Sequence, residues 1–391
     1  MFSPILKQKI IGFTAFLFVL LCLVDPTNTI FRLKIPAFLL FITSLAVSYK
    51  PNYQYAGIIL SLIFVSLISL FLGFHGEISA DAPIQLQYSI FFTLLITLLW
   101  SEHIDLFFPL SFAGFVISII SILGFMTMQF YPEIAKVLYL FSMSHDQPFF
   151  MSQRTFLGVE FSSFVFMSLP PTFIPAAIYY EKLLYEKENR CKNLLLTIVY
   201  FFAFFCSGQR AMFLGIFAIL MIISYPRIKQ FRLLQLLIII FVIIGIYIGY
   251  LAIIDPNSNS TNIKFGHIES YWDLFQSHIE YLIFGMGPGA FFYSKGFEMM
   301  TSLTEWTYIE IIRMYGLVGL FFFVCLLIIP IVRHNNEKNP IKYWQSIVVG
   351  YIVFLISCMS DPWLIGSPGL ICILFIYSVV DNPKFQKEKI Q

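Results

Sequence analysis

Charged side chains are scarce in this sequence, where Asp, Glu, Lys and Arg make up 12% of the 391 residues. A soluble domain carries roughly a quarter, so too few charges are present to cover a water-facing surface. Hydrophobic residues reach 59% and fall in blocks of about 15 to 25 residues, the length that crosses a ~30 Å hydrocarbon core as a helix. Because these blocks lack the alternation of barrel strands, the sequence predicts an all-α polytopic membrane protein.

Paired cysteines, dense basic runs and a signal-peptide cleavage site are also missing. The six cysteines are scattered without a CxxC pair, so neither a metal site nor a disulfide framework is indicated. A net charge of +2 without a basic run argues against a nucleic-acid partner. The first apolar block, Ile10–Val24, ends in Asp25-Pro26-Thr27 with no small-residue cleavage site. We therefore interpret it as a retained first helix.

The apolar blocks predict about twelve transmembrane helices in a single membrane domain, 1–391. An even number of spans places both termini on one side. Lys and Arg concentrate at the termini and in the connectors 179–193, 226–232 and 331–342, which places that side in the cytoplasm. Arg32 and Lys34 are an exception in the first outer loop. The helices are expected near 10–24, 35–49, 56–74, 86–100, 106–130, 156–179, 194–206, 211–225, 233–254, 304–330, 343–359 and 362–380.

Two predicted outer loops are long, at 131–155 and 255–303, and long loops in compact proteins are commonly functional. In the second loop, apolar and polar residues segregate at helical spacing, which predicts an amphipathic helix. Its aromatic face suits the membrane interface, and packing on top of the bundle explains the pattern equally well. The apolar set is Ile268, Tyr271, Trp272, Phe275, Ile279 and Leu282, and the polar set is Ser270, Asp273, Gln276, Ser277 and Glu280.

Charged residues at the lip of membrane helices are costly and are therefore functional candidates. Arg154 and Glu160 form one such pair: the arginine suits a phosphate and the carboxylate a base, or the two form an ion pair that fixes packing. Ser207-Gly208-Gln209-Arg210 is a polar break between helices. Arg210 begins the second of these, where N–H groups and the helix dipole favour an anion. A guanidinium beside such donors suits a pyrophosphate, whereas the alternative is a turn with a snorkelling arginine.

The glycines of the large outer loop form a second candidate group. Gly285, Gly287 and Gly289 permit a left-handed backbone and close approach, and successive N–H groups can form an anion nest. Any tight turn has the same pattern. His267, at the start of the amphipathic helix, is by itself most simply a solvated loop histidine.

The third group lies around the start of the tenth helix. Ser302 and Glu305 match a capping box, which is a structural role. Glu310 and Arg313 are three residues apart and can pair on one helix face. Because they are expected one to two turns inside a membrane span, a role in the site is the other interpretation.

Four of these segments, in this order, resemble the O-antigen polymerase and ligase family of bacterial polysaccharide assembly. The resemblance covers over half of the chain, and the order of the segments is more specific than any one of them. They are Arg154…Gly158-x-Glu160-x-Ser162, Ser207-Gly208-Gln209-Arg210, Phe284-Gly285-Met286-Gly287-Pro288-Gly289, and Thr304-Glu305-Trp306-x-Tyr308 with Tyr315-Gly316-Leu317-Val318-Gly319.

Three departures from the family pattern bear on the assignment. Gln209 replaces the second serine of the family's Ser–x–Ser–Arg turn. His267 stands, ahead of Trp272, where the large loop of the family commonly has an arginine, which leaves the catalytic assignment of the loop open. Ligases have a histidine where this chain has Glu305, and this difference favours a polymerase.

The resemblance implies glycosyl transfer, with inversion, between lipid-linked oligosaccharides at the periplasmic face of the bacterial inner membrane. The donor sugar leaves from undecaprenyl pyrophosphate, and neither a cofactor nor a metal is required. Arg154 and Arg210 would hold the pyrophosphate, and Glu160, Glu305 or His267 would accept the acceptor's hydroxyl proton. Expected partners are the lipid-linked oligosaccharides, the bilayer, a chain-length regulator and a flippase. The remaining expected binding residues are Ser207, Gly285, Gly287, Gly289 and Arg313.

Two other functions stay open at this point. A ligase would transfer the finished polymer to lipid A-core. A flippase or secondary transporter would belong to a different class, in which internal repeats and broken helices at the midplane are usual. Here the polar residues gather at the outer lip and in one long outer loop, which suits a surface reaction better than alternating access.

Overall fold

Among the residues that the structure describes, six helices are long and apolar enough to cross a membrane. The computed structural model describes residues 3–75, 81–145, 147–156, 159–228, 259–336, 341–360 and 363–385. Three further apolar helices within these ranges are shorter. The expected membrane-embedded helical fold is therefore confirmed, whereas the count of twelve spans and their orientation stay predictions. The six candidate spans are Ile5–Val24, Tyr53–Gly73, Ile84–His103, Phe107–Phe130, Arg210–Arg227 and Thr307–Asn335.

The first five predicted helices are present, with bounds that differ from the predicted ones by at most six residues. Ser3 begins α1 by accepting a hydrogen bond from the Leu6 amide, and Asp81 caps α4 in the same way through Ile84, as short polar side chains do at helix N-termini. A kink at Trp100 divides the end of the fourth helix. The elements are α1 (Pro4–Val24), α2 (Lys34–Ser48), η1 (Tyr53–Tyr55), α3 (Ala56–His75), α4 (Ala82–Leu94), η2 (Leu95–His103) and α5 (Phe107–Phe130).

The helix predicted at 156–179 is wrong over its first half, which belongs to an antiparallel β-hairpin. Ser152 and Ser163 face each other across the hairpin and their hydroxyls lie 2.9 Å apart, while Phe149 stacks on Phe164. Such cross-strand pairs stabilise a sheet. Pro170 and Pro171 then delay the helix, because proline is not accommodated in a helix interior. This region contains α6 (Pro132–Ser144), β1 (Phe149–Phe156), β2 (Val159–Phe166), η3 (Pro170–Thr172) and α7 (Phe173–Tyr185); α6 and most of β1 occupy the predicted outer loop 131–155.

The helices predicted at 194–206 and 211–225 are confirmed as α8 (Arg190–Cys206) and α9 (Arg210–Ile228). The helix predicted at 233–254 lies outside the described residues. The large outer loop contains α11 (Asn259–Ser277), α12 (Ile279–Phe284), β3 (Phe292–Ser294) and β4 (Met299–Thr301). The last elements are α13 (Thr307–Asn336), α14 (Trp344–Ser357), η4 (Cys358–Ser360), α15 (Ser367–Asp381) and η5 (Pro383–Phe385).

The helix predicted in the large loop is present, and the side of it that packs against the protein only partly coincides with the predicted apolar side. His267, Ser270 and Tyr271 are buried, whereas Trp272 is 64% exposed. Ser270 can be buried because its hydroxyl donates to the Gly266 carbonyl and accepts the Lys295 amide, so that the cost of removing it from water is offset. The helix is also interrupted, since α11 ends at Ser277 and α12 begins at Ile279.

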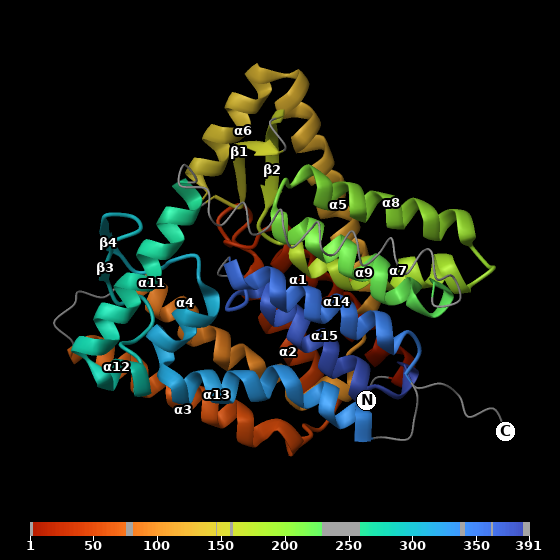
Figure 1. Cartoon of the computed structure of the whole chain (residues 1–391). Helices are drawn as coiled ribbons and strands as arrows, with labels where there is room; N and C mark the ends of the chain where they lie inside the picture. The colour runs from red at the N-terminus through yellow and green to blue at the C-terminus, as the bar shows by residue number, and fades with distance from the viewer. Residues whose placement is uncertain are drawn as a thin grey trace.

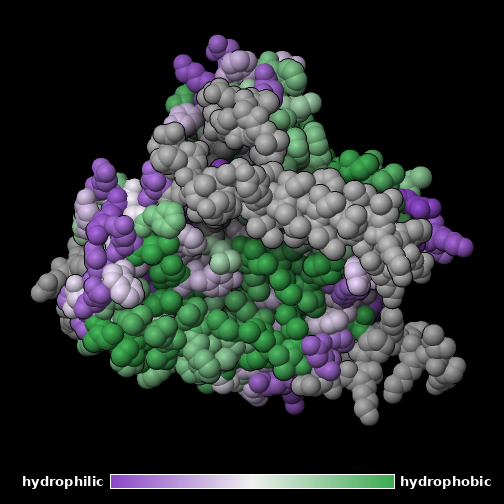
Figure 2. All heavy atoms as spheres, in the orientation of Figure 1, coloured by the Kyte–Doolittle hydropathy of each residue, from purple (hydrophilic) through white to green (hydrophobic). Residues whose placement is uncertain are grey.

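The core lies where α15 is surrounded by the other helices. Every residue of α15 from Pro368 to Val380 is buried. Around it, α5 packs on α1 and α8, α14 packs on α7 and α9, and α13 packs on α3 and α12. Figure 1 shows α11, α12 and β3–β4 at one end of α13, and α6 with β1–β2 projecting at the top. Apolar side chains cover α3 and α13 in Figure 2, whereas hydrophilic ones gather over α11 and β3–β4.

Segments that the sequence assigns to the cytoplasmic side contact one another at one end of the bundle. The Arg333 guanidinium lies 2.7 Å from the Asp381 carboxylate, and the Lys342 ammonium lies 3.3 Å from that of Glu186. Since a helix rises 1.5 Å per residue, the start of α13 lies roughly 35 Å from Arg333. The α8–α9 turn similarly lies ~25 Å from the start of α8. The large loop and the α8–α9 turn therefore belong to the opposite end.

Candidate functional site

A buried ion pair joins the large loop to the start of α13. Arg313 is 0% exposed and Glu310 1% exposed. The Arg313 Nε and Nη2 atoms lie 2.8 and 2.7 Å from Glu310 Oε2, as the three-residue spacing predicts. The other carboxylate oxygen, Oε1, accepts the Tyr271 hydroxyl at 2.6 Å and the Thr304 amide at 2.9 Å. The Tyr271 hydroxyl also forms a short hydrogen bond with that of Thr304. Both carboxylate oxygens are thus satisfied.

Arg313 binds the loop through its remaining donors. Its Nη1 donates to the Ala290 carbonyl at 2.9 Å and its Nη2 to the Ser302 carbonyl at 2.7 Å, and the guanidinium lies over the Phe292 ring. A buried guanidinium with all three nitrogens engaged has little capacity left for a pyrophosphate. The geometry therefore favours a positioning role for Arg313. We call residues 259–306 the outer-loop lobe.

The glycine segment of the lobe inserts against three membrane helices. The Gly285 amide donates to the Tyr281 carbonyl, the next amide to the Arg313 carbonyl at 2.8 Å, and the Gly287 amide to the Met314 carbonyl at 3.2 Å. The last two carbonyls would normally accept bonds from within α13, but Gly316, at φ 70° and ψ −179°, interrupts that helix. All three amides are therefore engaged, two of them with α13, and are not available as an anion nest.

Close backbone approach explains why glycine is needed in this segment. A Cβ atom on Gly287 would lie 2.6 Å from the Ser69 carbonyl of α3, and one on Gly289 would lie 2.7 Å from the Asp81 carbonyl at the start of α4. Both glycines have positive φ, 94° and 71°. These contacts support close backbone approach, rather than anion binding, as the role of these glycines.

His267 lies in the core of the lobe rather than in solvent. Its Nδ1 forms a 2.7 Å hydrogen bond with the Ser294 hydroxyl, and its ring meets the Phe297 ring edge-on. Burial lowers the pKa of His267 below its ordinary value, against the raising effect of the nearby Glu305 carboxylate. Its Nε2 is buried and has no hydrogen-bond partner among the described residues. A neutral imidazole that holds the β3–β4 hairpin against α11 fits these contacts.

Glu305 lies at the surface, where the lobe enters α13. Its carboxylate is 41% exposed and lies 3.6 Å from the Lys264 ammonium of α11. The neighbouring Trp306 donates its indole N–H to the Lys264 carbonyl at 3.1 Å, which fixes this junction to α11. Of the sequence-predicted bases whose side chains the structure describes, Glu305 is accessible and His267 is not.

A polar groove runs along the same lobe between α11 and the β3–β4 hairpin. It has a volume of about 380 Å³, and its lining includes Asp273, Ser277, His278 and Tyr293. The Lys295 ammonium, also in the lining, lies 2.7 Å from the Asp273 carboxylate. The groove therefore offers hydrogen-bond donors, acceptors and an aromatic ring on the surface that the large loop presents.

Ser207 and Arg210 occupy the tight turn between α8 and α9. The buried Ser207 hydroxyl donates to the Phe204 carbonyl at 2.6 Å and accepts the Gln209 amide at 3.3 Å, and Gly208 takes φ 61°. Arg210 is exposed at the first position of α9. Its guanidinium makes no hydrogen bond or ion pair with the described residues, and the amides of Arg210 and Ala211 are also without partners there, as expected at a helix N-terminus.

Arg154 and Glu160 lie in the β-hairpin and not at the start of a helix. Arg154 pairs with Phe161 across the strands, and Glu160 pairs with Thr155, so the two occupy adjacent rungs. Their side chains lie outside the described part of the structure. The predicted roles of both residues stay predictions.

The structure thus brings His267, Glu305 and the glycine segment together in one lobe, which Arg313 joins to α13. Ser207 and Arg210 share the same end of the bundle but form a separate turn. Sequence reasoning missed Tyr271 as a polar group, because its ring fitted the apolar face, and missed Lys264. Within the described ranges, no three His, Cys, Asp or Glu side chains gather closely enough to hold a metal ion; a metal-independent reaction stays a prediction.

Comparison with known proteins adds no relative to this picture. No protein-family model, curated protein or solved structure matches the chain. The resemblance of the four segments, in their order along the chain, therefore stays a prediction.

Proposed function

We propose that this protein is a polysaccharide repeat-unit polymerase, which transfers a glycan from undecaprenyl pyrophosphate to a lipid-linked acceptor at the outer face of the membrane. The proposal depends on the resemblance of the four segments. It is supported by the position of Arg210, Glu305 and the outer-loop lobe. All three lie at one end of the bundle, and the predicted cytoplasmic connectors contact one another at the opposite end.

The single observation that carries the proposal is the exposed Arg210 guanidinium at the N-terminus of α9. It lies beside two backbone amides that are without partners among the described residues. A cation beside free N–H donors is the combination that a pyrophosphate requires. Arg313, the other described arginine of the expected site, is already engaged by Glu310, Ala290 and Ser302. We therefore assign pyrophosphate binding to Arg210 and a positioning role to Arg313.

The reaction would proceed by direct displacement at the anomeric carbon of the donor sugar. The acceptor's hydroxyl oxygen forms a bond to this carbon while the bond from the carbon to the phosphate oxygen breaks. The electron pair of the broken bond leaves on undecaprenyl pyrophosphate, where Arg210 offsets the developing charge. Attack from the side opposite the leaving group inverts the anomeric configuration.

Glu305 is our candidate for the base that receives the hydroxyl proton. Its carboxylate is accessible, and accessibility to the substrate is the first requirement of a general base. The groove of the same lobe presents Asp273, Ser277 and Lys295, which suit the hydroxyl groups of a glycan. His267, buried and bonded to Ser294, would instead hold the wall of this groove.

Gene deletion followed by gel electrophoresis of the surface glycolipid separates this function from its alternatives. Loss of a polymerase leaves core bearing a single repeat unit. Loss of a ligase leaves bare core, with polymer retained on the lipid carrier. Loss of both the single-repeat band and the outward-facing lipid-linked intermediate would identify a flippase and refute the proposal.

Arg210→Ala tests the residue that carries the proposal. We expect the rate of polymer formation to fall by about a hundredfold or more, because removing one group that stabilises developing charge costs this much in other enzymes. Arg190→Ala is a matched control, since Arg190 is an exposed arginine at the first position of α8 and lies at the opposite end. Normal glycan ladders from Arg210→Ala, at normal protein level, would contradict the assignment.

A further inference from the structure

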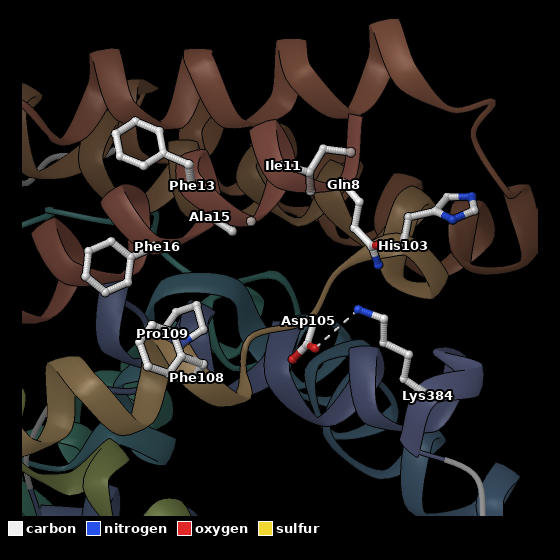
Figure 3. A pocket seen from close by; sticks show the side chains of 11 residues that line it. Gln8, Ile11, Phe13, Ala15, Phe16, His103, Asp105, Phe108, Pro109 and Lys384 are labelled. Atoms are coloured by element: carbon white, nitrogen blue, oxygen red, sulfur yellow. Dashed lines mark ion pairs between the residues drawn. The ribbon is translucent and has the colours of Figure 1, made fainter. Parts of the chain in front are cut away.

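A pocket of about 450 Å³ lies at the end of the bundle opposite the outer-loop lobe. It lies between α1 and the start of α5, and His103 and Lys384 complete its lining (Figure 3). The proposed polymerase reaction does not use it. Its position beside the contacts of the predicted cytoplasmic connectors places it at a membrane–water boundary.

The lining of this pocket changes from polar to apolar along both helices. Gln8 on α1 and Asp105 just before α5 lie at the polar end, and Phe16 and Phe108 at the apolar end. Figure 3 shows the Lys384 ammonium directed at Asp105 on the polar side, with the phenyl rings gathered on the other. Since Gln8 and Phe16 are eight residues apart on one helix, the change spans roughly 12 Å. A headgroup followed by the first part of an acyl chain has the same profile.

The apolar half of the pocket is open. Phe13 is 67% exposed and Phe108 is 65% exposed, so their rings would contact lipid. Next to Phe13, a Cβ atom on Gly12 would meet nothing within 4 Å. The wall is thus set back at Gly12, which leaves room for a chain to lie against α1.

The polar half carries one charge of each sign. The Lys384 ammonium lies 3.7 Å from the Asp105 carboxylate, and the two side chains are 52% and 41% exposed. Exposed pairs at such distances contribute little to stability, so exchanging each partner for a ligand group costs little. A zwitterionic headgroup is complementary to this pair, because the lysine can bind its phosphate and the carboxylate can bind its ammonium.

We propose that this pocket binds one phospholipid whose headgroup carries a phosphate and a primary ammonium, that is, a phosphatidylethanolamine. Lys384 binds the phosphate, Asp105 accepts hydrogen bonds from the ammonium, and an acyl chain lies over Gly12 against Phe16 and Phe108. The ammonium is essential to the argument, because a headgroup with a phosphate alone would leave Asp105 beside a second negative charge.

Native mass spectrometry of the full-length protein in mild detergent tests the site. Phosphatidylethanolamine, phosphatidylcholine and phosphatidylglycerol with identical acyl chains would be titrated against wild-type protein. We expect phosphatidylethanolamine to bind most tightly, because a quaternary ammonium cannot donate hydrogen bonds and a glycerol headgroup has no cation. Lys384→Gln should weaken all three lipids by about tenfold, as loss of one charge-assisted bond does. Asp105→Asn should abolish the preference for phosphatidylethanolamine.

Two glycine variants separate this pocket from general lipid contact. Gly12→Leu fills the open wall and should weaken phosphatidylethanolamine binding by about tenfold, since the leucine occupies the place of the acyl chain. Gly57→Leu is the matched control, because Gly57 lies on α3 and a Cβ there also meets nothing within 4 Å. Equal loss in both variants, wild-type binding by Gly12→Leu, or a preference that persists in Asp105→Asn would each overturn the proposal. Lys384→Gln and Asp105→Asn, at exposed positions, decide the matter if Gly12→Leu fails to fold.

Discussion

Replacing Arg313 by methionine is expected to release the outer-loop lobe from α13 while the membrane bundle stays folded. Methionine keeps a long apolar side chain but removes the donors to Glu310, Ala290 and Ser302. The Glu310 carboxylate would then be buried without its cation, and two loop carbonyls would lose their donors. The lobe is held by this network and by the glycine segment, so its detachment is the local response.

The expected magnitude follows from the burial of the pair. Removing one partner of a buried ion pair costs about 3 to 5 kcal/mol, because it leaves an uncompensated charge. Since every 1.4 kcal/mol is a factor of ten, the population of the open lobe should rise about a hundredfold or more. Tyr271→Phe removes one hydrogen bond to the same carboxylate and should cost about 2 kcal/mol. Glu310→Leu combined with Arg313→Met removes both charges and should be less destabilising than Arg313→Met alone.

Limited proteolysis, with cleavage sites mapped by mass spectrometry, measures this opening. When the lobe opens and closes faster than it is cut, the cleavage rate within 259–306 tracks the open population. Arg333→Met is a matched control, because it breaks an arginine–carboxylate pair at the other end of the same helix. It should leave cleavage of the lobe unchanged. A cleavage rate for Arg313→Met within twofold of wild type would refute the view that this pair holds the lobe.

Two further predictions concern the same lobe. Burial lowers the pKa of His267 in the folded lobe, so the unfolded segment takes up its proton first as the pH falls below about 6.5. Lobe stability should therefore decrease from pH 7 to pH 5.5, and His267→Gln should remove this part of the pH dependence of proteolysis; an unchanged slope would contradict the assignment. Gly287→Ala should detach the lobe at a cost of about 3 kcal/mol, because its Cβ would meet the Ser69 carbonyl at 2.6 Å. Gly12→Ala is the control, since the space around its Cβ is open and the lobe should stay attached. A wild-type rate of proteolysis for Gly287→Ala would show that the glycine segment tolerates a side chain at this position.

The membrane helices could be predicted because one property, the length of an apolar block, determines where they form. A long apolar block in a chain with so few charges has few alternatives to a helix in lipid, and α1 to α5 begin and end close to the expected residues. The hairpin of β1 and β2 was missed because short aromatic-rich runs are compatible with either a helix or a strand. What decides between them is the pairing of Ser152 with Ser163 and the diproline at Pro170, and the first of these depends on contacts outside the local sequence.

The candidate site was predictable in its residue types but not in its roles. The spacing of Glu310 and Arg313 predicts that they pair, and they do. The carbonyls of Ala290 and Ser302 accept the other hydrogen bonds of Arg313. They are backbone atoms that no sequence pattern identifies. For the same reason the burial of Ser270 could not be foreseen, since its acceptor and donor are the backbone of Gly266 and Lys295.

The contrast between Arg313 and Arg210 indicates how this protein uses its few charges at the outer end. A buried guanidinium must have its donors engaged, and Arg313 meets this requirement by fastening the lobe to α13 at the point where Gly316 interrupts that helix. An exposed guanidinium carries no such requirement, and Arg210 has no partner among the described residues. A fixed lobe and an unengaged cation at the same end of the bundle suit the transfer reaction proposed above, because that reaction would need the acceptor held in place while the pyrophosphate arrives and leaves. If the order were reversed, with Arg313 as the binding residue, each catalytic cycle would have to break a buried ion pair at a cost of about 3 to 5 kcal/mol. Arg210 involves no such cost, and for this reason we place the pyrophosphate there.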